Sequence, residues 1–168
     1  MTYTQEKYIK FAFYCKFAKK TLPLHAKLIY SYKNMAKTEI STLGEFGLIK
    51  HLTKDIKSMQ PSTQKGIGDD AAVMHYGDKR TLVTTDLLLE GIHFNLEYAP
   101  LKHLGYKAAV VNFSDIYAMN GTPTQITVSL VISKRFSVED LEQLYAGIRL
   151  ACERYNVDLV GGDTSASM

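Results

Sequence analysis

The sequence lacks several features that would define its class at once. No apolar run approaches the roughly 20 residues that a membrane-spanning helix needs. It has only two cysteines, Cys15 and Cys152, which lie far apart and match no metal-binding or redox spacing. These absences predict a soluble protein of the reducing cytoplasm, without disulfide bonds and without membrane contact.

The familiar nucleotide-binding patterns are also missing. Neither the P-loop pattern Gly-x-x-x-x-Gly-Lys-[Ser/Thr] nor the dinucleotide pattern Gly-x-Gly-x-x-Gly occurs. A nucleotide site in this chain would therefore have to be built from phosphates that are bridged by metal ions.

Basic residues are concentrated at the N-terminal end. Residues 1–40 carry eight Lys against two Glu, a net charge of +6, whereas the remaining 128 residues carry twelve bases and fifteen acids, a net charge of −3. The overall charge of +3 is therefore no argument for nucleic-acid binding, and we expect no nucleic-acid partner. The alternative, a basic nucleic-acid-binding arm on an inert domain, predicts salt-dependent binding that is lost when residues 1–34 are removed.

Residues 1–34 are expected to be an N-terminal extension outside the folded domain. They are rich in Lys, Tyr and Phe, Lys16 interrupts any apolar signal segment, and Pro23 would break a membrane-surface helix. Met35-Ala36-Lys37 resembles a translation start. We therefore expect an ATP- and Mg²⁺-binding domain over residues 35–168, truncated before a C-terminal domain.

Hydrophobic periodicity predicts the order helix, two strands, helix, strand, helix, strand. The expected elements are an amphipathic stretch from 43 to Pro61, strands 71–74 and 81–85, a helix 101–119, a strand 125–132, a helix 138–155 with Ser137 as its N-cap, and a strand 157–160. This order predicts an α+β (mixed α/β) fold, in which the two long helices pack on one face of a sheet.

Acidic residues recur beside glycine or hydroxyl residues. The motifs are Gly66-Ile67-Gly68-Asp69-Asp70, Thr84-Thr85-Asp86, Asn112-Phe113-Ser114-Asp115 and Gly161-Gly162-Asp163-Thr164. Hard cations such as Mg²⁺ take oxygen ligands and share them with substrate phosphates. The repeated pattern therefore suggests several divalent cations gathered around phosphate.

Each motif has local physical reasons to bind a cation or phosphate. Asp115 falls on the apolar stripe of its helix, where a carboxylate is costly unless it is paired or ligates a metal, and Asn112 adds an oxygen one turn earlier. Adjacent Asp69 and Asp70 repel each other unless a cation lies nearby. The glycine pair before Asp163 is expected to form a turn whose N–H groups face a phosphate.

Every motif alone also has an ordinary structural explanation. Asp115 could bond a neighbouring backbone group, the 66–70 segment could be a solvated turn, and a single loop histidine such as His93 is most often exposed to solvent. The joint occurrence of the motifs is what favours phosphoryl chemistry.

Taken together, the motifs resemble the thiamine-monophosphate kinases. They are Gly44-Glu45-Phe46-x-Leu48-Ile49, Gly66-Ile67-Gly68-Asp69-Asp70-Ala71-Ala72, Thr84-Thr85-Asp86-x-Leu88-x-Glu90-Gly91-x-His93-Phe94, Asn112-x-Ser114-Asp115-x-x-Ala118-Met119 and Gly161-Gly162-Asp163-Thr164. The resemblance covers the N-terminal half of that family and implies its fold, which is shared with aminoimidazole ribonucleotide synthetase. It also implies ATP-dependent phosphorylation of thiamine monophosphate to thiamine diphosphate, and a homodimer formed through the N-terminal domains.

The resemblance implies roles for individual residues. The Mg²⁺ ligands bridging ATP and substrate phosphates would be Asp70, Thr84, Thr85, Asp86, Asp115 and Asp163, with Asp86 and Asp115 central to catalysis. His93 would touch thiamine monophosphate, and Gly162, Asp163, Tyr106 and Lys107 would contact ATP. Asp69 would orient its loop. Transfer would be direct and in line, without a covalent intermediate.

Two alternatives stay open from the sequence. The chain could belong to another ATP-using member of the superfamily, of the selenophosphate synthetase or hydrogenase-maturation type, although Cys15 lies outside any reactive-cysteine motif. It could also be a catalytically silent dimerisation or metal-binding fragment. The turn Asn120-Gly121-Thr122-Pro123 departs from the Gly-Ala-x-Pro usual in the thiamine enzymes, but keeps a glycine and a proline.

Overall fold

The computed structural model describes residues 39–166 of the chain. The expected extension over residues 1–34, with Cys15, lies outside this described part. The chain divides into two units, residues 1–49 and 50–168. Within the described part, no helix is both long and apolar enough to cross a membrane.

The short 3-10 helix η2 (Ile40–Thr42) is followed by α2 (Gly44–Thr53), which crosses the boundary between the two units. Gly44 has a φ of +63°, a conformation that glycine adopts without strain. The predicted helix is confirmed, but it ends at Thr53, well before Pro61. Phe46 and Leu52, which the periodicity placed on an apolar face, are 85% and 66% exposed.

Three antiparallel strands form the first sheet of the second unit, in the order β1 (Thr63–Lys65), β2 (Ala72–Tyr76) and β3 (Lys79–Val83). Strands β2 and β3 form the predicted hairpin, with Tyr76 paired to Lys79 across a two-residue turn. Gly77 has the positive φ, +61°, that tight hairpin turns favour. Strand β1 was not predicted, because Thr63-Gln64-Lys65 is short and has no apolar alternation.

The long elements follow in the order α3 (Leu101–Ala118), β4 (Gln125–Ile132), α4 (Val138–Tyr155) and β5 (Asp158–Ala166). Strands β4 and β5 are parallel neighbours, joined through α4. Ser137 caps α4 as predicted, in a capping box with Asp140 that satisfies backbone N–H groups at the helix start. The two helices and the strand β4 are confirmed to within one residue.

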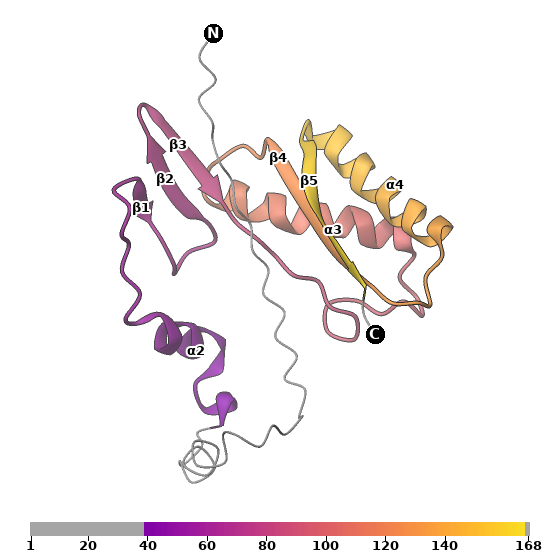
Figure 1. Cartoon of the computed structure of the whole chain (residues 1–168), viewed down its shortest axis with the longest axis horizontal. Helices are drawn as coiled ribbons and strands as arrows, with labels where there is room; N and C mark the ends of the chain where they lie inside the picture. The colour runs from indigo at the N-terminus through magenta and orange to yellow at the C-terminus, as the bar shows by residue number, and fades with distance from the viewer. Residues whose placement is uncertain (1–38, 167–168) are drawn as a thin grey trace, which may run out of the picture. The chain divides into compact units, whose positions relative to one another are not determined.

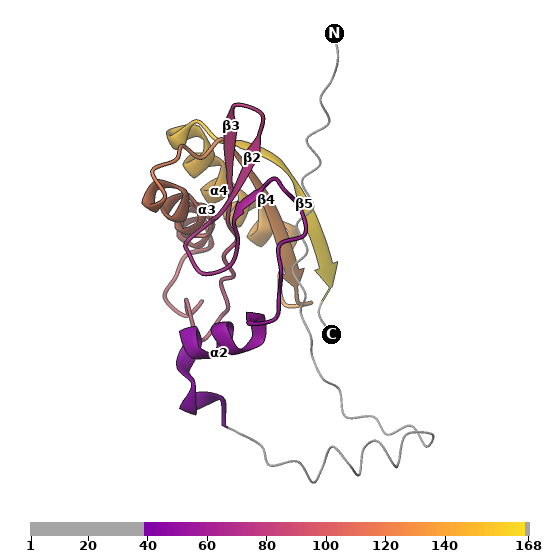
Figure 2. The ribbon, with the colours of Figure 1, turned by 90° about the vertical axis from the view of Figure 1, so that its left-hand side faces the viewer.

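Both long helices lie on one face of the β4–β5 pair, as predicted (Figures 1 and 2). The strands, however, form two sheets and not one, since β3 does not pair with β4. The mixed α/β class is therefore confirmed, with its strands divided between an antiparallel and a parallel sheet.

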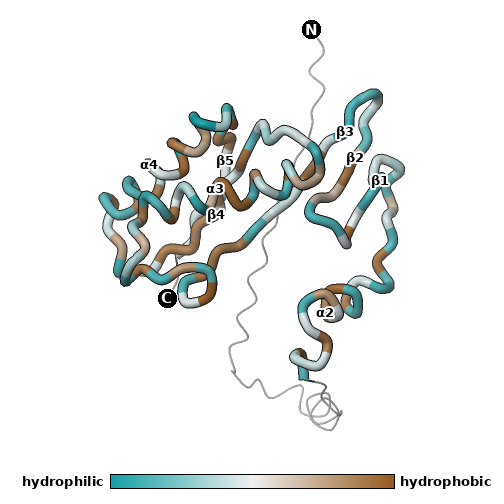
Figure 3. Tube along the Cα trace, turned by 180° about the vertical axis from the view of Figure 1, so that it is seen from behind, coloured by the Kyte–Doolittle hydropathy of each residue, from teal (hydrophilic) through white to brown (hydrophobic). Residues whose placement is uncertain are grey.

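The core lies between the two helices and the parallel strands. It is formed by Ala109, Phe113, Ile126, Ile148, Ala151, Cys152 and Val157. The trace of β4 is mostly hydrophobic in colour (Figure 3), and its buried residue Ile126 belongs to this cluster. Removing these side chains from water is the main favourable contribution to the packing of α3, α4 and β4.

Two glycines allow α3 and α4 to approach closely. A Cβ atom on Gly105 would lie 1.9 Å from the Leu144 carbonyl oxygen, and one on Gly147 would lie 1.9 Å from the Lys102 carbonyl oxygen. The backbones of the helices are therefore in contact at this crossing, which fixes the position of α3 along α4.

The segment 161–164 was predicted to be a turn, and that prediction is wrong. Strand β5 continues to Ala166, and Gly162 and Asp163 pair with Val128 and Ser129 of β4. A Cβ atom on Gly162 would lie 1.7 Å from the Val128 carbonyl oxygen. Here the glycine permits close approach of two strands, because the neighbouring strand supplies the backbone hydrogen bonds that a turn would leave open.

We expect Gly147→Ala to lower the free energy of unfolding by about 2 kcal/mol or more, because the new methyl group must push the helix backbones apart. Urea denaturation followed by circular dichroism would measure the loss. Gly161→Ala is the matched control, since a Cβ at Gly161 meets nothing within 4 Å. An equal effect of the two substitutions would contradict the close helix contact.

Candidate functional site

The segment that follows β3 has no regular secondary structure over residues 84–89 and is held against α3 by side chains. The first hydrogen bond to α3 is made by Thr84. Its hydroxyl oxygen lies 2.8 Å from Asp115 Oδ2 and 2.9 Å from the Asp70 carbonyl oxygen, so its single proton has two acceptors. This one hydroxyl brings together three of the residues that the sequence marked as metal ligands.

Asn112 of α3 makes the second hydrogen bond to this segment. Its Oδ1 accepts a hydrogen bond from the Asp86 backbone N–H at 3.0 Å, and its Nδ2 donates to the Ala108 carbonyl at 3.0 Å. The sequence suggested Asn112 as a further oxygen ligand. In the structure its amide oxygen holds the backbone of Asp86. Because Asn112 lies one turn of α3 before Asp115, its role is to position Asp86 near Asp115.

The Asp86 carboxylate is unusual in its electrostatics. Partial burial, and secondly the nearby charge of Asp115, raise its pKa above the ordinary 3.8, while His93 acts in the opposite direction. The nearness of the Asp115 charge to the Asp86 carboxylate marks a site of concentrated negative charge. A bound cation would offset that charge.

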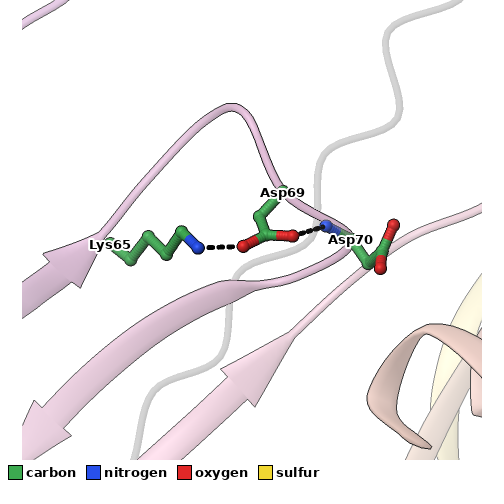
Figure 4. Close-up of polar contacts among 3 residues, drawn as sticks. All are labelled: Lys65, Asp69 and Asp70. Carbon is green, nitrogen blue, oxygen red and sulfur yellow. Dashed lines mark hydrogen bonds and ion pairs between the residues drawn. The ribbon is translucent and has the colours of Figure 1, made fainter. Parts of the chain in front are cut away.

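In the 66–70 loop, the charge of Asp69, which would repel that of Asp70, is paired with a lysine side chain. The Lys65 ammonium pairs with Asp69, and Asp69 Oδ1 accepts the Asp70 backbone N–H at 3.0 Å (Figure 4). These contacts, led by the Lys65 bond, lower the pKa of Asp69. Asp69 thus orients the loop, as the resemblance implied, and the side chain of Asp70 points away from this pair (Figure 4).

His93 lies in a short closed loop. Its ring Nδ1 accepts a hydrogen bond from the Leu89 backbone N–H at 2.9 Å, and its backbone N–H donates to the Leu89 carbonyl at 2.8 Å. The positive φ of Gly91, +80°, permits this tight turn. The Lys107 ammonium donates to the His93 carbonyl at 2.7 Å, which is a third hydrogen bond between α3 and the part of the chain that follows β3.

The remaining site residues lie elsewhere in the unit. Tyr106 packs against the core, and its hydroxyl is the main cause of a raised pKa at Tyr155. Gly162 and Asp163 lie on β5, where Asp163 accepts a hydrogen bond from the Ser165 hydroxyl at 3.3 Å. Thr85 is exposed between Thr84 and Asp86. The structure therefore brings together Asp70, Thr84, Asp86, Asp115 and, through the charge effect on Asp86, His93.

Sequence reasoning missed the ion pair between Arg135 and Glu90. Arg135 precedes α4, 45 residues from Glu90, so no local pattern could have indicated it. Lys65 was also missed, although its place four residues before Asp69 was a readable signal.

The donor atoms of the site suit a hard cation. Residues 39–166 hold no group of three or more His, Cys, Asp or Glu side chains that could hold a metal ion. The site instead offers two carboxylates, a hydroxyl and a backbone carbonyl, all of them oxygen donors. That set fits Mg²⁺, which commonly completes its coordination with water and substrate phosphates.

Comparison with known proteins agrees with this architecture. Residues 68–168, more than half of the chain, match the family described as AIR synthase related protein, N-terminal domain. The chain belongs to this family. Thiamine-monophosphate kinase from Aquifex aeolicus is 41% identical over 128 residues, which are 76% of this chain and 40% of the relative. The enzyme of the same name from Bacillus subtilis is 38% identical over 125 residues, 73% of this chain and 38% of the relative.

A solved structure has the same arrangement of elements. AaThiL complexed with AMPPCP and TMP superposes with a TM-score of 0.69 at 40% identity, covering 79% of this chain and 40% of that one. The fold expected from the motifs is thereby confirmed. This AIR synthase related domain spans about two fifths of the length of the curated relatives that it matches.

We expect Asp115→Asn to lower the pKa of Asp86, because it removes the nearby negative charge, but not to the ordinary value, because burial is the larger cause. A carbon-13 NMR titration of the Asp86 carboxyl would measure the change. A raised folded-state pKa means that Asp86 favours the folded protein most at pH values below the ordinary 3.8, and that this contribution is lost as the pH rises through the raised value.

Asp78→Asn, in the exposed β2–β3 turn, is the matched control and should leave the Asp86 titration unchanged. An Asp86 pKa that is the same with and without the Asp115 charge would show that the two carboxylates do not interact.

Proposed function

We propose that this chain is the N-terminal part of a thiamine-monophosphate kinase, which transfers a phosphoryl group from ATP to thiamine monophosphate. The observation that carries the proposal is the contact of the Thr84 hydroxyl with the Asp115 carboxylate and the Asp70 carbonyl, which brings together oxygen atoms from three separate motifs. The names of the relatives at 41% and 38% identity support the reaction and the substrate. The AMPPCP and TMP of the AaThiL complex support both ligands.

In this proposal Asp70, Thr84, Thr85, Asp86, Asp115 and Asp163 provide the oxygen ligands for Mg²⁺. Mg²⁺ held by these residues would supply positive charge that offsets the negative charge of the phosphates during transfer. Thr84 and Asn112 keep Asp115 and the backbone of Asp86 in place before the substrate arrives, so little reorganisation is needed when it binds.

The exposed His93 would contact thiamine monophosphate from its loop, and the charge effect on Asp86 supports its closeness to the carboxylates. Gly162 and Asp163 of β5 would lie along ATP, with Tyr106 and Lys107 as further candidates. No side chain of the site needs to act as a covalent nucleophile, since the terminal phosphate of the substrate can itself attack the γ-phosphorus of ATP in line.

We further propose that the protein works in the cytoplasm as a homodimer formed through this domain. Exposed apolar residues on the parallel strands, Val131 at 64% and Val160 at 58%, support a sheet-mediated contact. Sedimentation equilibrium of the 168-residue chain would test it, and a monomer at all concentrations would contradict it.

The activity is tested with the whole protein, by following thiamine diphosphate formation from ATP and thiamine monophosphate with phosphorus-31 NMR. We expect formation of product that stops when Mg²⁺ is chelated and resumes when Mg²⁺ is added back. Asp115→Asn and Asp86→Asn should each lower kcat by about a hundredfold or more, because each removes a negative charge that would hold Mg²⁺ beside the reacting phosphates.

Asp78→Asn again serves as the control, and circular dichroism should show the same fold for every variant. Retention of activity within about tenfold in both site variants would contradict the metal-ligand assignment. An intact whole protein that phosphorylates no thiamine monophosphate would refute the proposed reaction.

A further inference from the structure

The loop from Leu89 to Phe94 is closed by its own backbone and is attached to the rest of the unit by two charged side chains. Internally, the Gly91 N–H donates to the Phe94 carbonyl at 2.8 Å, in addition to the two bonds between Leu89 and His93. Externally, Lys107 of α3 holds the His93 carbonyl, and Arg135 pairs with Glu90. The loop is therefore a compact unit whose orientation depends on these two attachments.

The hydrogen bond from Leu89 determines which nitrogen of His93 carries the proton. A ring nitrogen that accepts a backbone N–H has no proton of its own, so Nδ1 is unprotonated in the neutral ring. The proton of the neutral imidazole must then lie on Nε2. Among residues 39–166, Nε2 makes no hydrogen bond, and the His93 side chain is exposed, so an Nε2–H donor is available to a ligand.

Lys107 acts on this ring through the backbone. Its ammonium lies 2.7 Å from the His93 carbonyl oxygen, a short charge-assisted hydrogen bond. That carbonyl belongs to the same residue whose N–H and ring nitrogen both bond to Leu89. Holding the carbonyl therefore fixes the backbone from which the ring extends, and keeps Nδ1 opposite the Leu89 N–H.

We propose that Lys107 is a positioning residue that presents His93 to the substrate as an Nε2–H donor. The inference rests on the proposed function for the identity of the substrate, but not for the state of the ring. It assigns to the substrate a hydrogen-bond acceptor at this point, such as a phosphate oxygen or an unprotonated ring nitrogen. It also gives Lys107 a role distinct from the ATP contact that the resemblance implied.

The first test measures the His93 tautomer in the 168-residue chain, by long-range nitrogen-15 NMR at a pH of about 8, above the ordinary histidine pKa. His93→Gln identifies the signal. We expect a single Nε2–H tautomer in the unaltered chain and a mixture of tautomers in Lys107→Met. Lys107→Arg, which keeps a cationic donor, should restore the single tautomer.

Lys102→Met is the matched control, because Lys102 is an exposed lysine on the same helix. It should leave the His93 ring unchanged. An Nδ1–H tautomer or a mixture in the unaltered chain would overturn the proposal, and so would a ring that is unaffected by Lys107→Met.

The second test uses steady-state kinetics of the whole protein. Lys107→Met should raise the KM for thiamine monophosphate by about tenfold, the effect of losing one well-placed hydrogen bond, with the KM for ATP within about twofold of its original value. A rise in the KM for ATP instead would identify Lys107 as a nucleotide ligand and refute the positioning role. If the whole protein does not phosphorylate thiamine monophosphate at all, the proposed function fails, and the tautomer measurement still decides the role of Lys107.

Discussion

The hydrogen bond between Thr84 and Asp115 joins the end of a strand to the last turn of a long helix, and the geometry of the site depends on it. It is effective only because α3 itself cannot shift. The helix is held against α4 by backbone contact at Gly105 and Gly147, and by the buried cluster around Phe113 and Ile148. The irregular segment after β3 then takes its shape from α3, at Thr84, at the Asp86 backbone and at His93.

Four acidic residues of this unit differ in their partners. Asp69 and Glu90 each pair with a basic side chain, Lys65 and Arg135, and both pairs orient loops. Asp86 and Asp115 have no such ion-pair partner in the described part of the chain, and partial burial, together with the Asp115 charge, raises the pKa of Asp86. The Thr84 hydroxyl holds the Asp115 carboxylate, and the Asn112 amide holds the backbone of Asp86. Two such carboxylates without a basic partner suit a metal ion that also binds phosphate, since the cation supplies the missing positive charge.

The long elements could be read from the sequence because their signals are local. Helices α3 and α4 and strand β4 follow from hydrophobic periodicity and from the Ser137 cap. Strand β1 was missed because it has no apolar alternation. The glycine pair at 161–162 was misread as a turn because its actual reason, the closeness of Gly162 to Val128, lies in another strand.

The sequence by itself determined which chemical groups are present: the carboxylates, the hydroxyls beside them and a histidine next to a glycine turn. Only the tertiary structure decided which of them meet. Thr84 reaches Asp115 across 31 positions of the chain, and Lys107 reaches the His93 carbonyl across 14. Such pairings depend on how α3 packs on α4, and that packing is set by close backbone contact between residues far apart in sequence, which no local pattern encodes.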